Sequence, residues 1–404
     1  MQIKKIRIQG FKSLEDVTFE PETGFSCLVG SNGAGKSNFC DALLFFQSII
    51  LNGVENTLNN FINVELIKNH NSIVSLDFLM SNNSNYIFEY CLKINLENKS
   101  IEKECIKHRE RFIYQREKSI NKLLNIDDLV TSFEERVAEA HKHQEKDNFK
   151  DILKNAYEDF NALKEGIPEK FIISKSNALS SDKSGLSAFF EEYELLDFFK
   201  ELSIFRINPL VPKLPNKVFN KSNLLMHGEN LATILSELKK DEDKWQTLHE
   251  WLGLIVPSIS EVEVKQGEFD SSLSLHFNEN GKLLPAISIS DGTIYTLSIL
   301  AAILWNQDKN TLLVIEEPER GIHPQAITEL INFMREATTQ HLNIITTTHS
   351  ETFVRNCKLE ELWLVDKVAG KTQLKSAKQQ NSHLKEASLD QAWLMNLFNG
   401  GLPW

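Results

Sequence analysis

Positive charge is the first thing that this sequence is short of. Its 404 residues include 44 lysines and arginines against 56 aspartates and glutamates, which gives a net charge of −12 at pH 7. A protein that holds DNA along much of its surface needs the opposite balance, because affinity for DNA rests on neutralised phosphates. The composition therefore argues against a wholesale electrostatic grip on DNA. A local basic groove, or one built by dimerisation, stays open.

Paired cysteines and long apolar runs are missing as well. The five cysteines are scattered and include no C-x-x-C pair, so neither a zinc site nor a disulfide framework is predicted. The N-terminus enters a strand pattern at once and lacks the apolar core of a signal peptide. The longest apolar run, Ile294 to Trp305, is too short to span a bilayer. We expect a cytoplasmic protein without membrane contact.

Glycine, by contrast, is concentrated in the stretch LVGSNGAGKSNFCDAL, which runs from Leu28 to Leu43. Gly30 to Ser37 spells G-x-x-x-x-G-K-S, the pattern of a loop whose backbone N–H groups wrap the phosphates of a nucleotide. Glycines let the backbone approach closely because no Cβ stands in the way. An apolar strand precedes the loop and a helical pattern follows it, so the phosphates would meet the positive end of a helix.

This phosphate loop (residues 30–37) predicts ATP and Mg²⁺ as ligands. Lys36 would reach the β- and γ-phosphates, and the hydroxyl of Ser37 would ligate Mg²⁺. The residues expected to contact the nucleotide here are Gly30, Ser31, Asn32, Gly33, Ala34, Gly35, Lys36, Ser37 and Asn38. A phosphate loop alone still leaves many enzyme classes open.

The rest of the chain predicts one head interrupted by an insertion. SIVSLDFLM and YIFEYCLKINL alternate like a β-hairpin, and alternating strands return from Ile259. Between them, dense mixed charge with apolar residues at helical spacing predicts a helical insertion. We expect an N-terminal part of the head over residues 1–100, the insertion over 101–204, and the C-terminal part of the head over 205–404.

Three later stretches narrow the class through their order along the chain. AISISDGTIY places the Ser-Asp-Gly run 290–292 before an apolar helix, where Ser290 is a natural N-cap and an anion would find donors. TLLVIEEPE gives a buried parallel strand that ends in Glu316 and Glu317. LNIITTTHS gives another apolar strand, which ends in His349. Their order and spacing make independent coincidence implausible.

With these motifs the chain resembles the ABC-type ATPase heads of the SMC, RecF and OLD group. More narrowly, it resembles the stand-alone AAA-family ATPases of bacterial anti-phage defence operons. The resemblance covers both ends of the chain, about residues 1–100 and 205–404, and includes GFKSL near the start and GGLPW at the end. It implies an α/β fold, a P-loop ABC-type ATPase head whose mixed sheet is flanked by helices.

The resemblance also implies roles for the matched residues. Lys36 would serve the phosphates, while Ser37 and Glu316 would serve the metal. Glu317 would be the general base that aligns the attacking water, and His349 would be the switch histidine that senses the γ-phosphate. Glu316 stands where the family usually has aspartate, a variant that suits the RecF and OLD side of the group.

The signature, residues 290–292, would contact the γ-phosphate bound to a second subunit. It consists of Ser290, Asp291 and Gly292, without the double glycine of transporters. The glutamine that normally senses Mg²⁺ in the family has no clear counterpart. Gln47 comes too soon after the phosphate loop, and Gln115 falls in the expected insertion.

We therefore expect an Mg-dependent ATPase that forms a homodimer or a larger even-numbered assembly. It would act as a switch for a separately encoded effector, a nuclease or toxin, with nucleic acid as a further candidate partner. One alternative is a self-sufficient nuclease or toxin whose active site lies in the insertion, where HKHQEKDNF begins at His141. A second alternative is the nucleotide-binding subunit of a transporter, which the missing L-S-G-G-Q signature disfavours.

Overall fold

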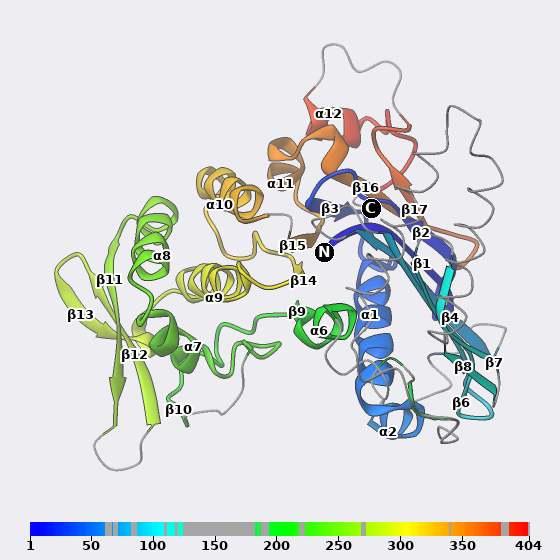
Figure 1. Cartoon of the computed structure of the whole chain (residues 1–404). Coiled ribbons are helices and arrows are strands. Elements are labelled where there is room, and N and C mark those ends of the chain that lie inside the picture. The colour runs from blue at the N-terminus through cyan, green and yellow to red at the C-terminus, as the bar shows by residue number, and fades with distance from the viewer. Residues whose placement is uncertain are drawn as a thin grey trace, which may run out of the picture.

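The computed structural model is a mixed α/β protein with three sheets (Figure 1). It describes residues 1–60, 67, 72–81, 87–108, 111–117, 120–123, 182–184, 186, 194–217, 223–267, 272–338, 341–380 and 388–402. The sequence expectation of an α/β fold with a mixed sheet flanked by helices is confirmed. The stretch at His141 lies outside the described residues.

A six-stranded sheet, in the order β17-β16-β3-β15-β14-β9, carries the sequence motifs. Its strands are β3 (Phe25–Val29), β9 (Ser203–Phe205), β14 (Thr311–Glu316), β15 (Leu342–Thr348), β16 (Leu362–Val368) and β17 (Lys371–Ser376). All neighbours are parallel except the β16–β17 pair. Strands β3 and β15 are buried along their whole length, as expected of central strands in a parallel sheet. The carboxyl ends of the parallel strands therefore share one edge.

A seven-stranded antiparallel sheet lies beside it, in the order β2-β1-β4-β5-β6-β7-β8. Its strands are β1 (Gln2–Phe11), β2 (Leu14–Phe19), β4 (Ile73–Ser81), β5 (Ile87–Asn95), β6 (Ser100–His108), β7 (Arg111–Glu117) and β8 (Ile120–Leu123). Helix α1 (Lys36–Asn52) fills the space between the two sheets, and its apolar residues share one core with both. Helix α6 (Glu194–Glu201) also contributes to this core, and α2 (Val54–Asn60) follows α1.

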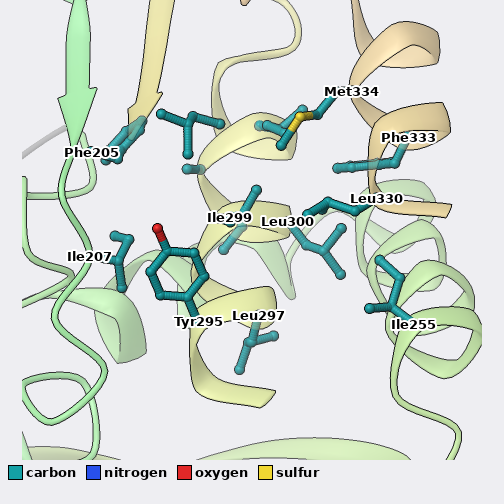
Figure 2. Packing of buried hydrophobic residues seen from close by; sticks show 14 of the residues in the cluster. Phe205, Ile207, Ile255, Tyr295, Leu297, Ile299, Leu300, Leu330, Phe333 and Met334 are labelled. Carbon is teal, nitrogen blue, oxygen red and sulfur yellow. The ribbon is translucent and has the colours of Figure 1, made fainter. Parts of the chain in front are cut away.

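A second core surrounds α9 (Asp291–Asn306), which is buried on nearly all sides. Helices α7 (Leu231–Leu238), α8 (Glu242–Ile255) and α10 (Pro324–Ala337) pack around it, and α11 (Glu351–Asn356) and α12 (Leu389–Leu394) follow. Figure 2 shows Leu300 of α9 close to Leu330 of α10 and Ile255 of α8. The small sheet of β10 (Asn216–Lys217), β11 (Ile259–Gln266), β12 (Ser272–Glu279) and β13 (Lys282–Pro285) covers the outer side (Figure 1).

The helical insertion expected over residues 101–204 is wrong at its start. Residues 100–108, 111–117 and 120–123 form β6, β7 and β8, which extend the antiparallel sheet. Glu102, Lys103 and Glu104 stand together on β6, a charged run that favours an exposed helix in the sequence. In the sheet, however, Glu104 is fully buried and accepts from Oη of Tyr90. Of the remaining expectation, α6 is a helix, and residues 124–181 lie outside the described part of the chain.

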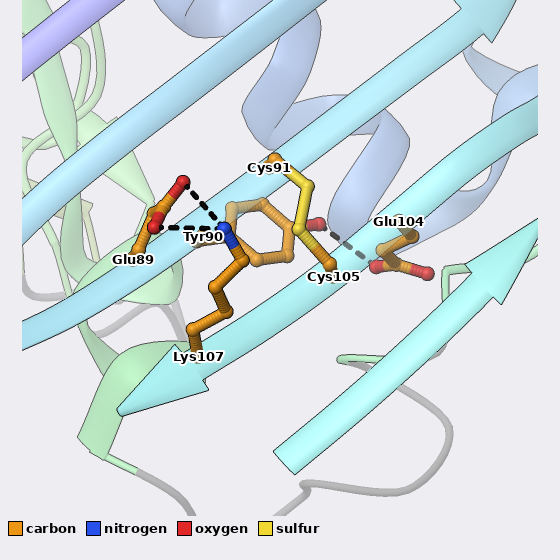
Figure 3. Close-up of a disulfide and its surroundings, with 6 residues drawn as sticks. All are labelled: Glu89, Tyr90, Cys91, Glu104, Cys105 and Lys107. Atoms are coloured by element: carbon orange, nitrogen blue, oxygen red, sulfur yellow. Dashed lines mark hydrogen bonds and ion pairs between the residues drawn. A yellow bond between two sulfur atoms is a disulfide. The ribbon is translucent and has the colours of Figure 1, made fainter. Parts of the chain in front are cut away.

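A disulfide joins Cys91 to Cys105, which the sequence analysis did not predict (Figure 3). The two residues are direct partners on β5 and β6, with their Cα atoms 5.1 Å apart. Glu89 and Lys107 form an ion pair on the same two strands. Scattered spacing in the sequence hides such a pair, because only the register of the two strands brings the thiols together.

The sequence predicts that the protein makes no contact with a membrane. Within the described ranges, no helix is both long and hydrophobic enough to cross a bilayer.

Candidate functional site

The phosphate loop connects β3 to α1 as its sequence pattern predicted. Lys36 is the first residue of α1, and its Nζ donates to the carbonyl oxygen of Gly30 at 2.6 Å and to that of Ser31 at 3.0 Å. The loop is thus curled around the ammonium group. Burial lowers the pKa of Lys36 despite the nearby carboxylate of Glu317, which raises it. A largely desolvated cation is suited to holding an anion.

The glycines of the loop serve two different purposes. A Cβ on Gly30 would lie 2.1 Å from the carbonyl oxygen of Val365, and one on Gly35 would lie 2.0 Å from Oγ1 of Thr372. These two glycines therefore let the loop pack against β16 and β17. Gly33 has φ +80° and nothing within 4 Å of its Cβ position. Its side of the loop is open, as a cradle for phosphate requires.

The turn between β1 and β2 supports the phosphate loop through side-chain hydrogen bonds. Oγ of Ser13 accepts from Nδ2 of Asn38 at 2.7 Å and shares a hydrogen bond of 2.7 Å with Oγ1 of Thr372. Thr372 in turn donates to the carbonyl oxygen of Ala34 at 2.9 Å. Ser13 belongs to the GFKSL stretch, so that stretch supports the phosphate loop. The sequence analysis missed this contact of Thr372, because β17 lies far away along the chain.

The two carboxylates at the end of β14, Glu316 as its last residue and Glu317 directly after it, face different neighbours. Oγ of Ser37 donates to Oε2 of Glu316 at 3.3 Å. Oε1 of Glu317 lies 3.3 Å from Nδ1 of His349, which follows the adjacent strand β15. Glu317 has φ 50°, in the left-handed region that non-glycine residues rarely adopt. Such backbone strain clusters at functional sites, where the surrounding structure holds it in place.

Arg206 is a site residue that the sequence analysis did not identify. It follows β9, the strand next to β14, and its Nε donates to Oε1 of Glu316 at 2.7 Å. Its Nη2 donates to Asp41 at 2.5 Å, and Lys12 reaches the other oxygen of Asp41 at the same distance. Burial opposes ionisation of Asp41, but the hydrogen bonds from Lys12 and Arg206 outweigh it and hold the pKa of Asp41 below its usual value.

Tyr295 and Glu319 complete the surroundings of the carboxylates. Oη of Tyr295, on α9, donates to the carbonyl oxygens of Glu316 and Glu317 at 2.7 and 3.0 Å. Glu319 accepts from Oγ1 of Thr348, the last residue of β15, while its Oε2 is buried without a partner. Burial raises the pKa of Glu319 to about 7. Neither residue stood out in the sequence.

The signature residues contact α9 itself, Lys213 and the loop that follows β14. Oγ of Ser290 accepts from the backbone N–H of Thr293 at 3.1 Å, so the predicted N-cap is confirmed. Asp291 pairs with Nζ of Lys213 at 2.5 Å. A Cβ on Gly292 would lie 2.0 Å from the carbonyl oxygen of Gly321, so glycine is required here for packing alone.

The glutamines considered for sensing Mg²⁺ have other places in the fold. Nε2 of Gln47 donates to the carbonyl oxygens of Phe199 and Leu202, both at 2.7 Å, and so joins α1 to the end of α6. Gln115 lies in β7 of the antiparallel sheet.

The residues at this edge fit a magnesium nucleotide. Lys36 and the open side of Gly33 suit phosphate, and Ser37 and Glu316 offer the hard oxygen ligands that Mg²⁺ prefers. Glu317, hydrogen-bonded neither to Ser37 nor to Arg206 among the contacts described, faces His349 instead. The structure thus groups Lys36, Ser37, Glu316, Glu317 and His349 as predicted at the carboxyl ends of β3, β14 and β15.

Solved structures share this fold. The chain matches an Smc head bound to the C-winged helix domain of ScpA with a TM-score of 0.50 and 12% identity, over 97% of this chain and 99% of that one. It also matches an Smc head domain with an extended coiled coil, bound to the C-terminal domain of ScpA derived from Pyrococcus furiosus. That match has a TM-score of 0.50 and 12% identity, over 98% of both chains. At this identity, the likeness concerns the fold alone.

Two curated proteins match over short segments. One is the chromosome partition protein Smc of Methanocaldococcus jannaschii, 44% identical over 43 residues, or 11% of this chain and 4% of that protein. The other is the DNA double-strand break repair Rad50 ATPase of Sulfolobus acidocaldarius, 47% identical over 45 residues, or 11% of this chain and 5% of that protein. The matched segments thus span only about a twentieth of these relatives.

A family model covers far more of the chain. The AAA_21 model, described as "AAA domain, putative AbiEii toxin, Type IV TA system", matches residues 25–355, which include the phosphate loop, the signature, Glu316, Glu317 and His349. The chain therefore belongs to the AAA_21 family, and its fold is that of the SMC head domains.

Proposed function

We propose that this chain is a dimeric ATPase switch of a bacterial anti-phage defence complex, located in the cytoplasm. In this proposal it controls a separately encoded effector, a nuclease or a toxin. One observation carries the switch assignment. Lys36, Glu316, Glu317 and His349 converge at one sheet edge, whereas the side chains of Ser290 and Asp291 contact Thr293 and Lys213 and, among the contacts described, not the phosphate loop of their own chain. A second copy of the chain would bring its signature to the nucleotide.

Each group at the edge has a role in hydrolysis under this proposal. Lys36 and the amides of the phosphate loop bind the phosphates, and Ser37 with Glu316 holds Mg²⁺. Magnesium, when bound, neutralises charge on the phosphoryl group that is transferred. Glu317 orients the attacking water and accepts its proton, and His349 contacts the γ-phosphate. Glu317 has a left-handed backbone, and its carboxylate lies against His349.

Mixing two inactive variants tests whether the ATPase site is shared between subunits. Lys36→Ala removes the phosphate ligand, and Ser290→Arg blocks the signature. A dimer of one variant with the other would still hold one intact pair, Lys36 from one subunit and Ser290 from its partner. Random pairing should restore about a quarter of the wild-type ATPase rate, given a symmetric dimer. Two inactive variants that stay inactive when mixed would contradict a shared site.

The effector part of the proposal is supported by the resemblance to ATPases of bacterial anti-phage defence operons, and the family description names a Type IV TA system. In this proposal the insertion, about residues 101–200, holds or senses the effector. Because residues 100–108, 111–117 and 120–123 belong to the antiparallel sheet, the deletion that tests this should span only residues 124–181. We expect the shortened protein to keep its basal ATPase rate and to lose both co-purification with the product of the adjacent gene and protection against phage. Retained protection would refute a role of this segment in holding the effector.

The same family description favours a second candidate, in which the chain is itself the toxin. The purified protein would then cleave DNA or RNA with Mg²⁺ and without any partner. Incubation of the isolated protein with labelled nucleic acids, with and without EDTA, separates the two candidates. Metal-dependent cleavage that survives the Lys36→Ala substitution would favour the toxin. A separately encoded effector is absent from this preparation, so the cleavage would have to come from the chain itself.

A further inference from the structure

Arg206 is held in place from both its backbone and its side chain. Its N–H donates to the carbonyl oxygen of Met226 at 2.9 Å, and its own carbonyl oxygen lies 2.8 Å from Nδ1 of His227. Its guanidinium bridges Asp41 on α1 and Glu316 on β14. The side chains of Arg206 and Glu316 are 30% and 15% exposed, so water screens this contact only in part. The guanidinium is therefore a fixed feature of the site.

Arg206 and three neighbouring side chains form a cluster whose charges balance. Lys12 and Arg206 are the cations, and Asp41 and Glu316 are the anions of one continuous chain of contacts. The negative charge of Glu316 is thus already balanced by Arg206 before any metal binds. Arg206 binds Oε1 of Glu316, and this leaves Oε2 directed at Ser37, where the donors for Mg²⁺ lie. The contact both neutralises and orients the carboxylate.

We propose that Arg206 is a positioning residue that acts as a built-in counter-cation for Glu316, so that the site accepts a nucleotide with little dependence on Mg²⁺. Without this guanidinium, the uncompensated Glu316 would repel the phosphates of metal-free ATP. Bound Mg²⁺ would relieve that repulsion, so metal-free binding would suffer more than binding with metal. The proposal rests on the assignment of Glu316 to the metal site made above.

The test measures the affinity for a fluorescent ATP analogue in Mg²⁺ and in excess EDTA, at the same ionic strength. The readout is the ratio of the two dissociation constants, the value in EDTA divided by the value in Mg²⁺. We expect Arg206→Gln to raise this ratio about tenfold, in the range that one charge-assisted hydrogen bond accounts for. Arg206→Lys keeps the charge and should restore most of the wild-type ratio. Lys12→Gln, one contact further away, should change it by about twofold at most.

A further variant acts in the opposite direction and does not depend on Arg206→Gln folding. Asp41→Asn leaves Glu316 as the carboxylate partner of Arg206, so the ratio should fall about threefold because the cluster gains net positive charge. A ratio that is unchanged in Arg206→Gln, or that rises in Asp41→Asn, overturns the inference. If wild-type protein binds no nucleotide in either buffer, the proposed function fails together with it. If nucleotide binds tightly and the ratio in Arg206→Gln equals that of the wild type, only the role of Arg206 is overturned.

Discussion

The imidazole of His349 lies beside the carboxylate of Glu317, with Nδ1 of the histidine 3.3 Å from Oε1 of the glutamate. The two residues follow β15 and β14, which are adjacent and parallel. Their contact is therefore set by the pairing of two buried strands. Glu317 is also fixed by its N–H, which donates to the carbonyl oxygen of Thr347 at 2.9 Å. Such a rigid carboxylate suits a base that must hold one water in line.

Glu317→Gln should leave ATP binding intact and slow hydrolysis by roughly 10² or more, the range for a positioned base. The amide keeps the shape of the side chain but cannot accept the proton. ATP-bound dimers should then accumulate, which size-exclusion chromatography with radiolabelled ATP can detect. If Glu316→Gln traps ATP instead, and Glu317→Gln loses its response to Mg²⁺, then we have assigned the two carboxylates in reverse.

Lys36→Ala should weaken ATP binding by about 10² or more, because a buried cation in the phosphate loop is lost and its phosphate contacts with it. Equilibrium binding of a fluorescent ATP analogue measures this loss. Lys4→Ala provides the control, since Lys4 lies exposed on β1 and hydrogen-bonds only to Gln2 among the contacts described. Unchanged affinity in Lys36→Ala would refute the assignment of the phosphate loop.

Glu319→Gln should change how stability depends on pH. Burial raises the pKa of Glu319 to about 7 from an ordinary value of 4.5. The native state thus keeps a proton that the unfolded state releases, and this contribution to stability is complete below pH 4.5 and is lost as the pH rises through 7. Glutamine cannot ionise, so the variant should gain on the wild type by at most about 3 kcal/mol between pH 5 and 8. Urea unfolding of the nucleotide-free proteins measures the difference; parallel curves at all pH values would contradict it.

The bond between Cys91 and Cys105 closes a short loop, with the two residues 14 positions apart. Replacing both by serine should lower the free energy of unfolding by about 3 kcal/mol, as the entropy of loop closure predicts. Reduction of the wild type with dithiothreitol should give a similar loss, and the double variant should not respond to the reductant. Wild-type protein that unfolds identically with and without reductant would show that the bridge does not stabilise the fold.

Local patterns in the sequence were sufficient to predict where the phosphate loop and the strand-end carboxylates lie in the fold. Gly30 and Gly35 have no room for a side chain beside Val365 and Thr372, and Gly33 has a positive φ that favours glycine. The sequence shows both requirements directly, as glycines at these positions. The run before Glu316 is apolar because β14 is buried between layers. The N-cap at Ser290 is likewise a local hydrogen bond, made three residues away. Each of these features is encoded within a few residues of where it acts.

Only the tertiary structure decided the contacts between residues that lie far apart along the chain. Residues 100–108, 111–117 and 120–123 are strands because they extend an existing antiparallel sheet, although their charge density resembles that of an exposed helix. Cys91 meets Cys105 through strand register, which composition does not reveal. Arg206 meets Glu316 because β9 pairs with β14, two strands separated by about a quarter of the chain. Periodicity and spacing describe neighbours along the chain, whereas these contacts depend on which strands pair and in which register.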